Sequence, residues 1–255
     1  PKPSESPHDA FIAGHASTSV SAALGMARAR TLTGDDYSVV ALLGDGSMTG
    51  GLSYEALNDA GQSNQPLIVI LNDNGMSITK NVGGISKHLA RLRLRPQYFH
   101  FKDLYHKTLS TMPGGKRLYG HLHNLKRAVK DALLPGSLFE SMGFTYLGPA
   151  DGHDVNKICQ LLCLARDMKK PVLIHLHTIK GKGYVFSEKN PCGYHGVDSF
   201  DISSGKNNGA PKPNYSGVFG NTIVDLAYRD DRICAVTAAM GIGTGLSDFS
   251  QKFPN

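Results

Sequence analysis

Residues 37–75, YSVVALLGDGSMTGGLSYEALNDAGQSNQPLIVILNDNG, decide the fold. Residues 37–43 form a short apolar run rich in β-branched side chains, which is typical of a strand buried on both faces. Residues 52–60 have a helical period that ends at Gly61, and residues 66–71 are a second apolar run. A strand, a helix and a strand in such close succession predict a βαβ unit and therefore a parallel sheet.

The alternation of helices and strands continues on both sides of this unit. Ser and Thr residues begin a helix-like run over residues 17–30, which is the signature of a capped helix. Residues 155–168 predict an amphipathic helix, and residues 172–180 predict another apolar strand. We therefore expect an α/β fold in which helices flank a parallel sheet.

Changes in composition divide the chain into segments. Residues 1–186 carry the alternating pattern and are predicted to form the core domain. Residues 187–215 are rich in Gly, Pro, Asn and Ser and are too long for an ordinary connection, so we expect a linker there. Residues 216–255 predict a helix followed by a strand at residues 233–240. A segment of this length cannot close a core of its own, so we expect only the start of a second domain.

The composition excludes several classes of protein. Hydrophobic residues make up 40% of the 255 residues and charged residues 19%, which is typical of a globular chain. No apolar run approaches the roughly 18 residues of a membrane span, and residues 1–10 lack the features of a signal peptide. The cysteines have no zinc-type spacing and are expected to be free thiols: Cys159, Cys163, Cys192 and Cys234. We expect a cytosolic protein without a membrane partner.

The net charge of +6 comes from one segment. Residues 80–130 hold twelve Lys or Arg and a single acid, Asp103, whereas the remainder of the chain is slightly acidic. Clustered cations near Tyr98 and Phe99 are one way to bind nucleic acid. However, apolar residues at helical spacing favour a mobile surface helix that covers a site, neutralises phosphorylated substrates or docks a subunit. We therefore favour this second interpretation, and nucleic-acid binding through the basic segment remains the non-enzyme alternative.

Two loops follow the two apolar strands of the βαβ unit, at Gly44-Asp45-Gly46 and at Asn74-Gly75. Ligands of an open parallel sheet bind beyond the carboxyl ends of its strands, so both loops can face one ligand. Asp45 offers a carboxylate oxygen, Asn74 an amide oxygen and the main chain just after it a carbonyl, and Mg²⁺ prefers such oxygens. The glycines and the amides that open the next helix suit a phosphate. Either loop alone is also an ordinary turn, but together they predict a magnesium diphosphate ligand.

The two loops together resemble the cofactor signature of thiamine-diphosphate enzymes, with Asn74 lying 29 residues beyond Asp45. Further blocks extend the likeness over the whole chain: SESPHDAFIAGHASTSVSAALGMA, GPADGHD, IKGKGYVFSE and GYHGVD. In this order they are similar to the family of 1-deoxy-D-xylulose-5-phosphate synthases. The nearest alternative is transketolase, which shares the fold and the metal pattern and moves a two-carbon unit between sugar phosphates.

This resemblance implies a thiamine-diphosphate-binding, transketolase-like fold and a homodimer. The family uses thiamine diphosphate and Mg²⁺ to join pyruvate to glyceraldehyde 3-phosphate with loss of carbon dioxide. The product is a precursor of isoprenoids, thiamine and pyridoxal. Such a transferase is expected in the bacterial cytoplasm or in a plastid.

The resemblance also assigns roles to residues. Asp45, Asn74 and the carbonyl of Met76 would bind the metal, and His195 would face the substrate. Contacts with the cofactor would come from Gly14, His15, Ala16, Gly46, Ser47, Asn74 and Tyr184.

Each assigned role has a simpler alternative. His15 is also placed to cap the helix that follows, Tyr184 is also a plausible core residue, and His195 lies in a stretch typical of an exposed loop. His175 and His177 share a face of a predicted strand but have no third ligand at suitable spacing, so we interpret both as structural.

One catalytic group of the family has no counterpart here. The resemblance implies a glutamate in the second domain that contacts the aminopyrimidine ring of the cofactor. The chain contains only Glu5, Glu55, Glu140 and Glu188, and none has a matching sequence context. We therefore expect the chain to be a fragment: the diphosphate-binding domain at residues 1–186 with the start of the pyrimidine-binding domain, inactive by itself.

Overall fold

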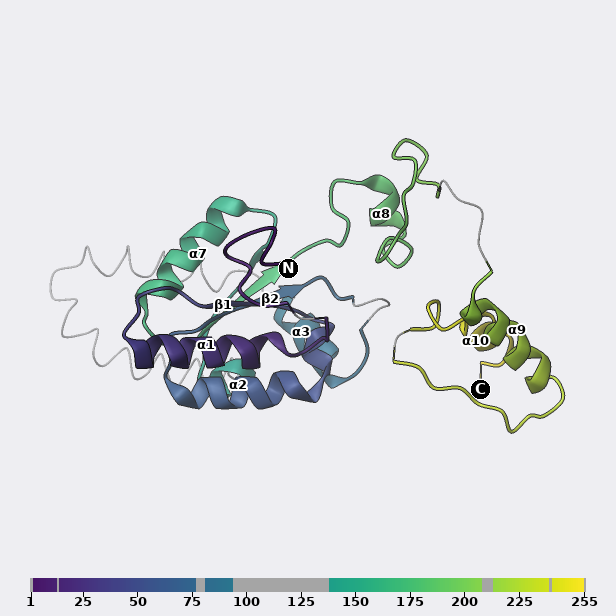
Figure 1. Ribbon diagram of the computed structural model, residues 1–255, viewed down its shortest axis with the longest axis horizontal. Helices are drawn as coiled ribbons and strands as arrows, with labels where there is room; N and C mark the ends of the chain where they lie inside the picture. The colour runs from purple at the N-terminus through teal and green to yellow at the C-terminus, as the bar shows by residue number, and fades with distance from the viewer. Residues whose placement is uncertain are drawn as a thin grey trace. The chain divides into compact units, whose positions relative to one another are not determined.

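The computed structural model of the chain contains two compact units (Figure 1). The first comprises Pro1–Gly75 and Asn81–Thr178, and the second comprises Met76–Lys80 and Ile179–Asn255. The structure describes residues 2–12, 14–76, 81–93, 138–207, 213–238 and 240–254. None of the helices within these ranges is long and apolar enough to cross a membrane.

A parallel sheet of four strands forms the centre of the first unit. In spatial order the strands are β1 (Val40–Gly44), β2 (Ile68–Asp73), β4 (Val172–His177) and β3 (Thr145–Asp151). All three neighbouring pairs are parallel. Because the strands are parallel, their carboxyl ends lie at one edge of the sheet, and the predicted α/β fold with a parallel sheet is confirmed.

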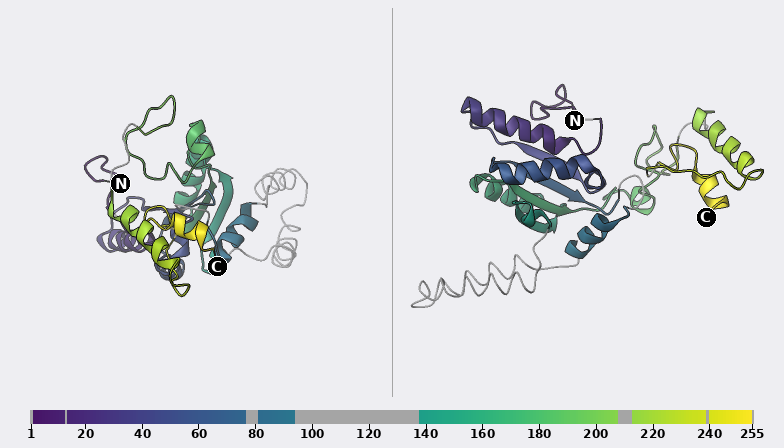
Figure 2. Two further views of the ribbon diagram at one scale, coloured as in Figure 1. Left: turned by 90° about the vertical axis from the view of Figure 1, so that its right-hand side faces the viewer. Right: turned by 90° about the horizontal axis from the view of Figure 1, so that it is seen from below.

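Helices cover both faces of this sheet. The flanking elements are α1 (Ser19–Thr33), the 3-10 turn η1 (Ser47–Thr49), α2 (Gly51–Ser63), α3 (Gly84–Arg93), α6 (Leu138–Ser141) and α7 (Val155–Asp167). The helices α1 and α2 lie side by side on one face, whereas α7 lies on the other (Figures 1 and 2). The larger hydrophobic cluster joins α1, α2 and α3 to the sheet, and a second cluster joins α7 to β2, β3 and β4.

The strands differ in how deeply they are buried. The inner strands β2 and β4 are buried along most of their length, as their continuous apolar sequences predict. The prediction that residues 37–43 form a strand buried on both faces is wrong. In β1, Ala41 and Leu43 face the core, but Val40 and Leu42 are 45% and 65% exposed. The physical reason is that α1 and α2 pack on one face of β1, whereas the cluster that α7 forms on the other face of the sheet includes residues of β2, β3 and β4 but none of β1.

The start of α1 also differs from the prediction. The helix begins at Ser19, and the side chain of its N-cap residue, Thr18, makes no capping hydrogen bond. Instead the Thr18 hydroxyl donates to the carbonyl of His15 at 3.0 Å, and the Ser17 hydroxyl donates to the carbonyl of Ser47 at 2.7 Å. The hydroxyls that were predicted to cap the helix therefore hold in place the residues that precede it.

The predicted basic segment, residues 80–130, is described only over residues 81–93. Within it, α3 forms where a helix was expected and packs on the core through Leu89 and Leu92. The rest of this segment lies outside the described residues, so its mobility and its role stay predictions.

The second unit holds three helices in its described residues: α8 (Val185–Lys189), α9 (Tyr215–Ala227) and α10 (Ser247–Lys252). A small cluster of buried side chains joins α9 to α10. The predicted strand at residues 233–240 is wrong, since residues 233–238 have no strand structure. A strand requires a hydrogen-bonded partner strand, and the described part of this unit supplies none.

Candidate functional site

The two predicted loops meet at the carboxyl edge of the sheet. The last residue of β1, Gly44, pairs with Asn72 of β2, and the amide of Asp45 donates to the Asn72 carbonyl at 3.2 Å. The Gly75 amide donates to the Asp73 side chain at 3.2 Å, and Asp73 in turn interacts with the Asp45 side chain. Asn74 lies in the turn between Asp73 and Gly75, and both of these residues affect the Asp45 carboxyl. The structure therefore brings Asp45 and Asn74 to one place, as the sequence predicts.

Asp45 is a buried carboxyl, and the charged neighbour that most affects it among the described residues is a second carboxyl, Asp73. Asp45 is only 2% exposed to solvent, and its Oδ2 accepts a hydrogen bond from Asn81 Nδ2 at 2.8 Å. Burial, followed by the charge and the hydrogen bond of Asp73, raises the pKa of Asp45 to about 6. The amides of Gly75 and Gly46 oppose this shift only in part.

Asp73, the last residue of β2, has the opposite environment. It is fully buried, yet its Oδ1 accepts from Arg93 Nη1 at 3.0 Å and its Oδ2 lies 2.9 Å from His175 Nε2. Burial alone would raise the pKa of Asp73, but the hydrogen bond and electrostatic interaction with His175 and the charge of Arg93 lower it overall. Asp73 therefore carries the negative charge of the Asp45–Asp73 pair.

The hydrogen-bonded chain continues from His175 to Tyr146. The Tyr146 hydroxyl lies 2.6 Å from His175 Nδ1, and His175 is fully buried. Burial, followed by the charges of Asp73 and Glu140, raises the pKa of Tyr146, so its hydroxyl keeps its proton. The predicted companion of His175, His177, is exposed at the end of β4, and these two histidines form no metal pair.

Sequence reasoning did not single out Asp73, His175, Tyr146 or Arg93 as parts of this site. One signal was available: VLIHLH places a histidine inside an otherwise apolar strand, and a buried polar side chain needs a partner. The partner itself could not be read from the sequence, because it depends on β4 lying beside β2.

The predicted cofactor-contacting residues of the first unit surround the same loops. Gly46 and Ser47 lead from β1 into η1, and the Ser47 carbonyl accepts from the hydroxyls of Ser17 and Ser53. A Cβ at Gly50 would collide with the Ser17 side chain, so the two segments approach closely. The Ser17 contact also draws the exposed stretch Gly14, His15 and Ala16 toward this loop.

Three predicted site residues belong to the second unit: Met76, Tyr184 and His195. The Tyr184 ring packs in an aromatic cluster formed with Phe186, Tyr194 and Phe200. The Tyr184 side chain is half-buried, and its hydroxyl donates to the carbonyl of Ile202 at 2.9 Å. The exposed His195 ring lies with its Nδ1 3.0 Å from Lys180 Nζ.

The donors of the first unit fit a divalent cation. A buried carboxyl next to a second carboxyl, with an asparagine beside it, is a set of hard oxygen donors at which a cation would offset the negative charge. Among the described residues no group of three His, Cys, Asp or Glu side chains is arranged to hold a metal. A site here would therefore rely on amide and main-chain oxygens in addition to Asp45.

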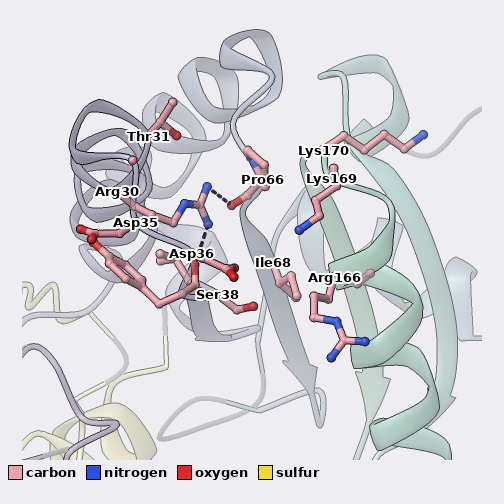
Figure 3. A pocket seen from close by; sticks show the side chains of 14 residues that line it. Arg30, Thr31, Asp35, Asp36, Ser38, Pro66, Ile68, Arg166, Lys169 and Lys170 are labelled. Carbon is pink, nitrogen blue, oxygen red and sulfur yellow. Dashed lines mark hydrogen bonds between the residues drawn. The ribbon is translucent and has the colours of Figure 1, made fainter.

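The hollow in Figure 3 lies at the opposite, amino end of the strands and has a volume of about 380 Å³. Buried Arg30 lines it, and its guanidinium donates to the carbonyls of Tyr37 and Pro66 at 3.1 and 3.0 Å. None of the predicted site residues lines this hollow. Ligands of open parallel sheets bind at the carboxyl ends of the strands, which makes the Asp45 edge the candidate site rather than this hollow.

Fold and site together define a parallel α/β protein whose candidate ligand site lies where the first two strands end. A model of the 1-deoxy-D-xylulose-5-phosphate synthase family matches residues 1–178. The chain is 49% identical over 256 residues to the synthase of Clostridium tetani and 51% identical over 258 residues to that of Pelotomaculum thermopropionicum. These matches cover all of this chain but only 41% and 40% of the relatives. The chain belongs to the 1-deoxy-D-xylulose-5-phosphate synthase family, and the predicted resemblance is confirmed.

Solved structures include more distant matches. A transketolase from Campylobacter jejuni is 22% identical, with a TM-score of 0.43, and the match covers 92% of this chain and 29% of the transketolase. A putative thiamin diphosphate-dependent enzyme from Mycobacterium smegmatis is 17% identical, with a TM-score of 0.37 over 65% of this chain.

Proposed function

We propose that this chain supplies the diphosphate-binding part of a transferase that makes 1-deoxy-D-xylulose 5-phosphate. The substrates would be pyruvate and glyceraldehyde 3-phosphate, with carbon dioxide released, and the cofactors would be thiamine diphosphate and Mg²⁺. The observation that carries the proposal is the meeting of Asp45 with the Asn72–Gly75 loop at the carboxyl edge of the sheet. Family membership supports the reaction, and it favours this reaction over the two-carbon transfer of transketolase.

In this proposal the metal is held by Asp45, Asn74 and the carbonyl of Met76. The diphosphate lies against Gly46 and Ser47, where glycine lets the backbone approach and main-chain amides favour an anion. Gly14, His15 and Ala16 complete this side, since the Ser17–Ser47 hydrogen bond draws them to the loop. When bound, thiamine diphosphate supplies the electron sink that decarboxylation requires.

Two roles rest on the family resemblance alone. Tyr184 would contact the cofactor, although its hydroxyl is bonded to Ile202 in this structure. His195 would face the substrate, and its exposed ring beside Lys180 would be placed to exchange a proton.

The arrangement of domains is part of the proposal. Residues 1–186 would form the diphosphate-binding domain, residues 187–215 a linker, and residues 216–255 the start of a pyrimidine-binding domain. A homodimer is proposed from the family resemblance alone, and a location in the bacterial cytoplasm is proposed because the relatives are bacterial. Because the chain spans about 41% of their length, we expect it to bind the cofactor without forming product by itself.

Calorimetric titration of thiamine diphosphate into the 255-residue chain, with and without Mg²⁺, tests the proposed site. We expect binding that depends on Mg²⁺ and that Asp45→Ala weakens by at least about tenfold, because the variant lacks a metal-binding carboxylate. Asp59→Ala is the matched control, since Asp59 is an exposed carboxylate on α2 that pairs with Arg28. Binding that is the same without Mg²⁺, or equal in the two variants, would contradict the proposal.

A further inference from the structure

A continuous chain of buried polar side chains crosses the sheet behind the proposed metal site. Asp45 follows β1, Asp73 ends β2, His175 lies in β4 and Tyr146 lies in β3. Their order in the hydrogen-bonded chain is the spatial order of the strands, β1-β2-β4-β3. One member of the chain therefore lies in, or directly after, each strand of the described sheet, and the last two members have no part in the function proposed above.

We propose that His175 and Tyr146 are positioning residues for the metal-diphosphate site and that they act through Asp73. The inference rests on the function proposed above, because it takes Asp45 and Asn74 as metal ligands. Neither His175 nor Tyr146 would touch the metal or the cofactor.

The link to the metal loop runs through the Asp73 carboxylate. Besides His175 and Arg93, it accepts a hydrogen bond from the amide of Gly75 at 3.2 Å, which closes the turn that contains Asn74. Gly75 has φ +77, and a Cβ there would lie 2.9 Å from Arg93 Nη1, so the turn is packed against the guanidinium. The hydrogen bonds that hold the Asp73 carboxylate in place therefore also hold the turn that carries Asn74.

The imidazole of His175 is held at both nitrogens. An ionised carboxylate only accepts hydrogen bonds, so Nε2 must carry the proton that bonds to Asp73. The Nδ1 of a neutral ring is then an acceptor, and the Tyr146 hydroxyl is its donor. Outer residues that orient a metal-binding group in this way tune metal affinity without contacting the ion.

The hydrogen bond between the Tyr146 hydroxyl and His175 Nδ1 can be removed without changing the packing of the ring. The Tyr146 ring stacks on Phe139, with centroids 6.1 Å apart and an interplanar angle of 3°, and its edge meets the His175 ring. Phenylalanine preserves both ring contacts, so Tyr146→Phe removes only the hydroxyl that bonds to Nδ1.

The test is the affinity for Mg²⁺ at saturating thiamine diphosphate, measured by calorimetry on the 255-residue chain. The variants are Tyr146→Phe, His175→Leu and His175→Gln, and each is compared with the wild type in its unfolding by urea. We expect the first two variants to weaken Mg²⁺ binding about 10- to 100-fold, which is typical of lost outer-shell partners. His175→Gln should bind more tightly than His175→Leu, because an amide N–H can still donate to Asp73.

Arg30→Met is the matched control for a loss of stability. Arg30 is also a buried polar residue with two hydrogen bonds, but it lies at the amino ends of the strands (Figure 3). We expect this variant to unfold at lower urea concentration while its Mg²⁺ affinity stays within about twofold of the wild type, since the effects of distant, independent sites add.

The possible results separate the two proposals. If the wild type shows no Mg²⁺-dependent binding, the proposed function fails for this chain, and the present inference fails with it. If the wild type binds and Tyr146→Phe and His175→Leu bind equally well, only the present inference is overturned. It is also overturned if Arg30→Met weakens binding as much as they do, because the effect would then be general destabilisation.

Discussion

Asp45 and Asp73 are two buried carboxyl groups in contact, yet the surroundings shift their pKa values in opposite directions. Asp73 receives hydrogen bonds from Arg93 and His175, whereas Asp45 receives them from the neutral Asn81 side chain and from backbone amides. Like charges at this separation disfavour double ionisation, so the proton of the pair resides on Asp45. In the absence of a bound cation, ionisation of both carboxyl groups of this site therefore lowers the stability of the folded protein.

This pairing predicts a pH-dependent gain in stability for Asp45→Asn. Because the folded pKa of Asp45 is about 6, against an ordinary value of 3.8, its contribution to stability is complete below about pH 4. That contribution is lost as the pH rises through about 6. Asparagine cannot ionise, so the variant should exceed the wild type by about 3 kcal/mol at neutral pH, at about 1.4 kcal/mol per unit of pKa shift.

Urea unfolding between pH 4 and 7 in the absence of divalent cations measures this difference. Asp73 does not confound the comparison. Its folded pKa is lowered, so its contribution is present above 3.8 and is lost only at lower pH. A stability difference that does not change across the range would show that Asp45 ionises normally.

The residues of the site differ in how far the sequence reveals them. Asp45 and Asn74 were predictable because each follows directly after an apolar strand, and chain position alone puts both at the carboxyl edge. Asp73, His175 and Tyr146 were not, since their association depends on β4 lying between β2 and β3. No local pattern encodes that order.

At the scale of elements, one glycine determines how closely α2 approaches the turn before β3. A Cβ at Gly61 would overlap the carbonyl of Met142, and a Cβ at Gly143 would lie 2.6 Å from the Gly61 carbonyl. The sequence indicates Gly61 only as the end of a helix, whereas α2 continues to Ser63. The close packing, rather than helix termination, requires glycine here.

We therefore expect Gly61→Ala to lower the free energy of unfolding by about 1–3 kcal/mol, the usual cost of overpacking. Gly25→Ala is the matched control, because Gly25 lies in α1 and a Cβ there meets no atom within 4 Å. Gly25→Ala should raise the free energy of unfolding by about 0.5–1 kcal/mol, because alanine has a higher helix propensity than glycine. Urea denaturation of both variants measures the two free energies of unfolding, and equal changes in the two variants would contradict the packing argument.

The elements that the sequence predicted wrongly share one physical cause. Val40 and Leu42 have the sequence of a buried strand, but the α7 cluster that covers their face of the sheet does not include β1, so both stay exposed. Residues 233–238 have strand propensity and no strand to pair with. In both cases neighbours that are distant in the sequence decide the outcome, and local propensity does not.

On the scale of the whole molecule, the family model and the first compact unit end at the same residue, Thr178. That unit contains the whole described sheet, the two larger hydrophobic clusters and the hydrogen-bonded chain from Asp45 to Tyr146. A segment with its own core is expected to fold alone.

We expect a chain that ends at Thr178 to unfold cooperatively in urea and to keep the helical circular dichroism of its sheet-flanking helices. The reason is that its buried apolar side chains find their partners within the same unit. A broad, non-cooperative transition of the shortened chain would mean that residues 179–255 are needed for folding. The full chain, measured under the same conditions, is the reference.

The open side of β1 has a consequence for handling the protein. Among the described strands β1 lies at the edge, so its outer backbone N–H and C=O groups pair with no described strand, and Val40 and Leu42 add an apolar surface beside them. Natural edge strands are often protected by charge, proline or a bulge, whereas the VALLG sequence of β1 contains no charged residue and no proline. During expression at high concentration, this strand is where aggregation by strand-to-strand pairing would begin.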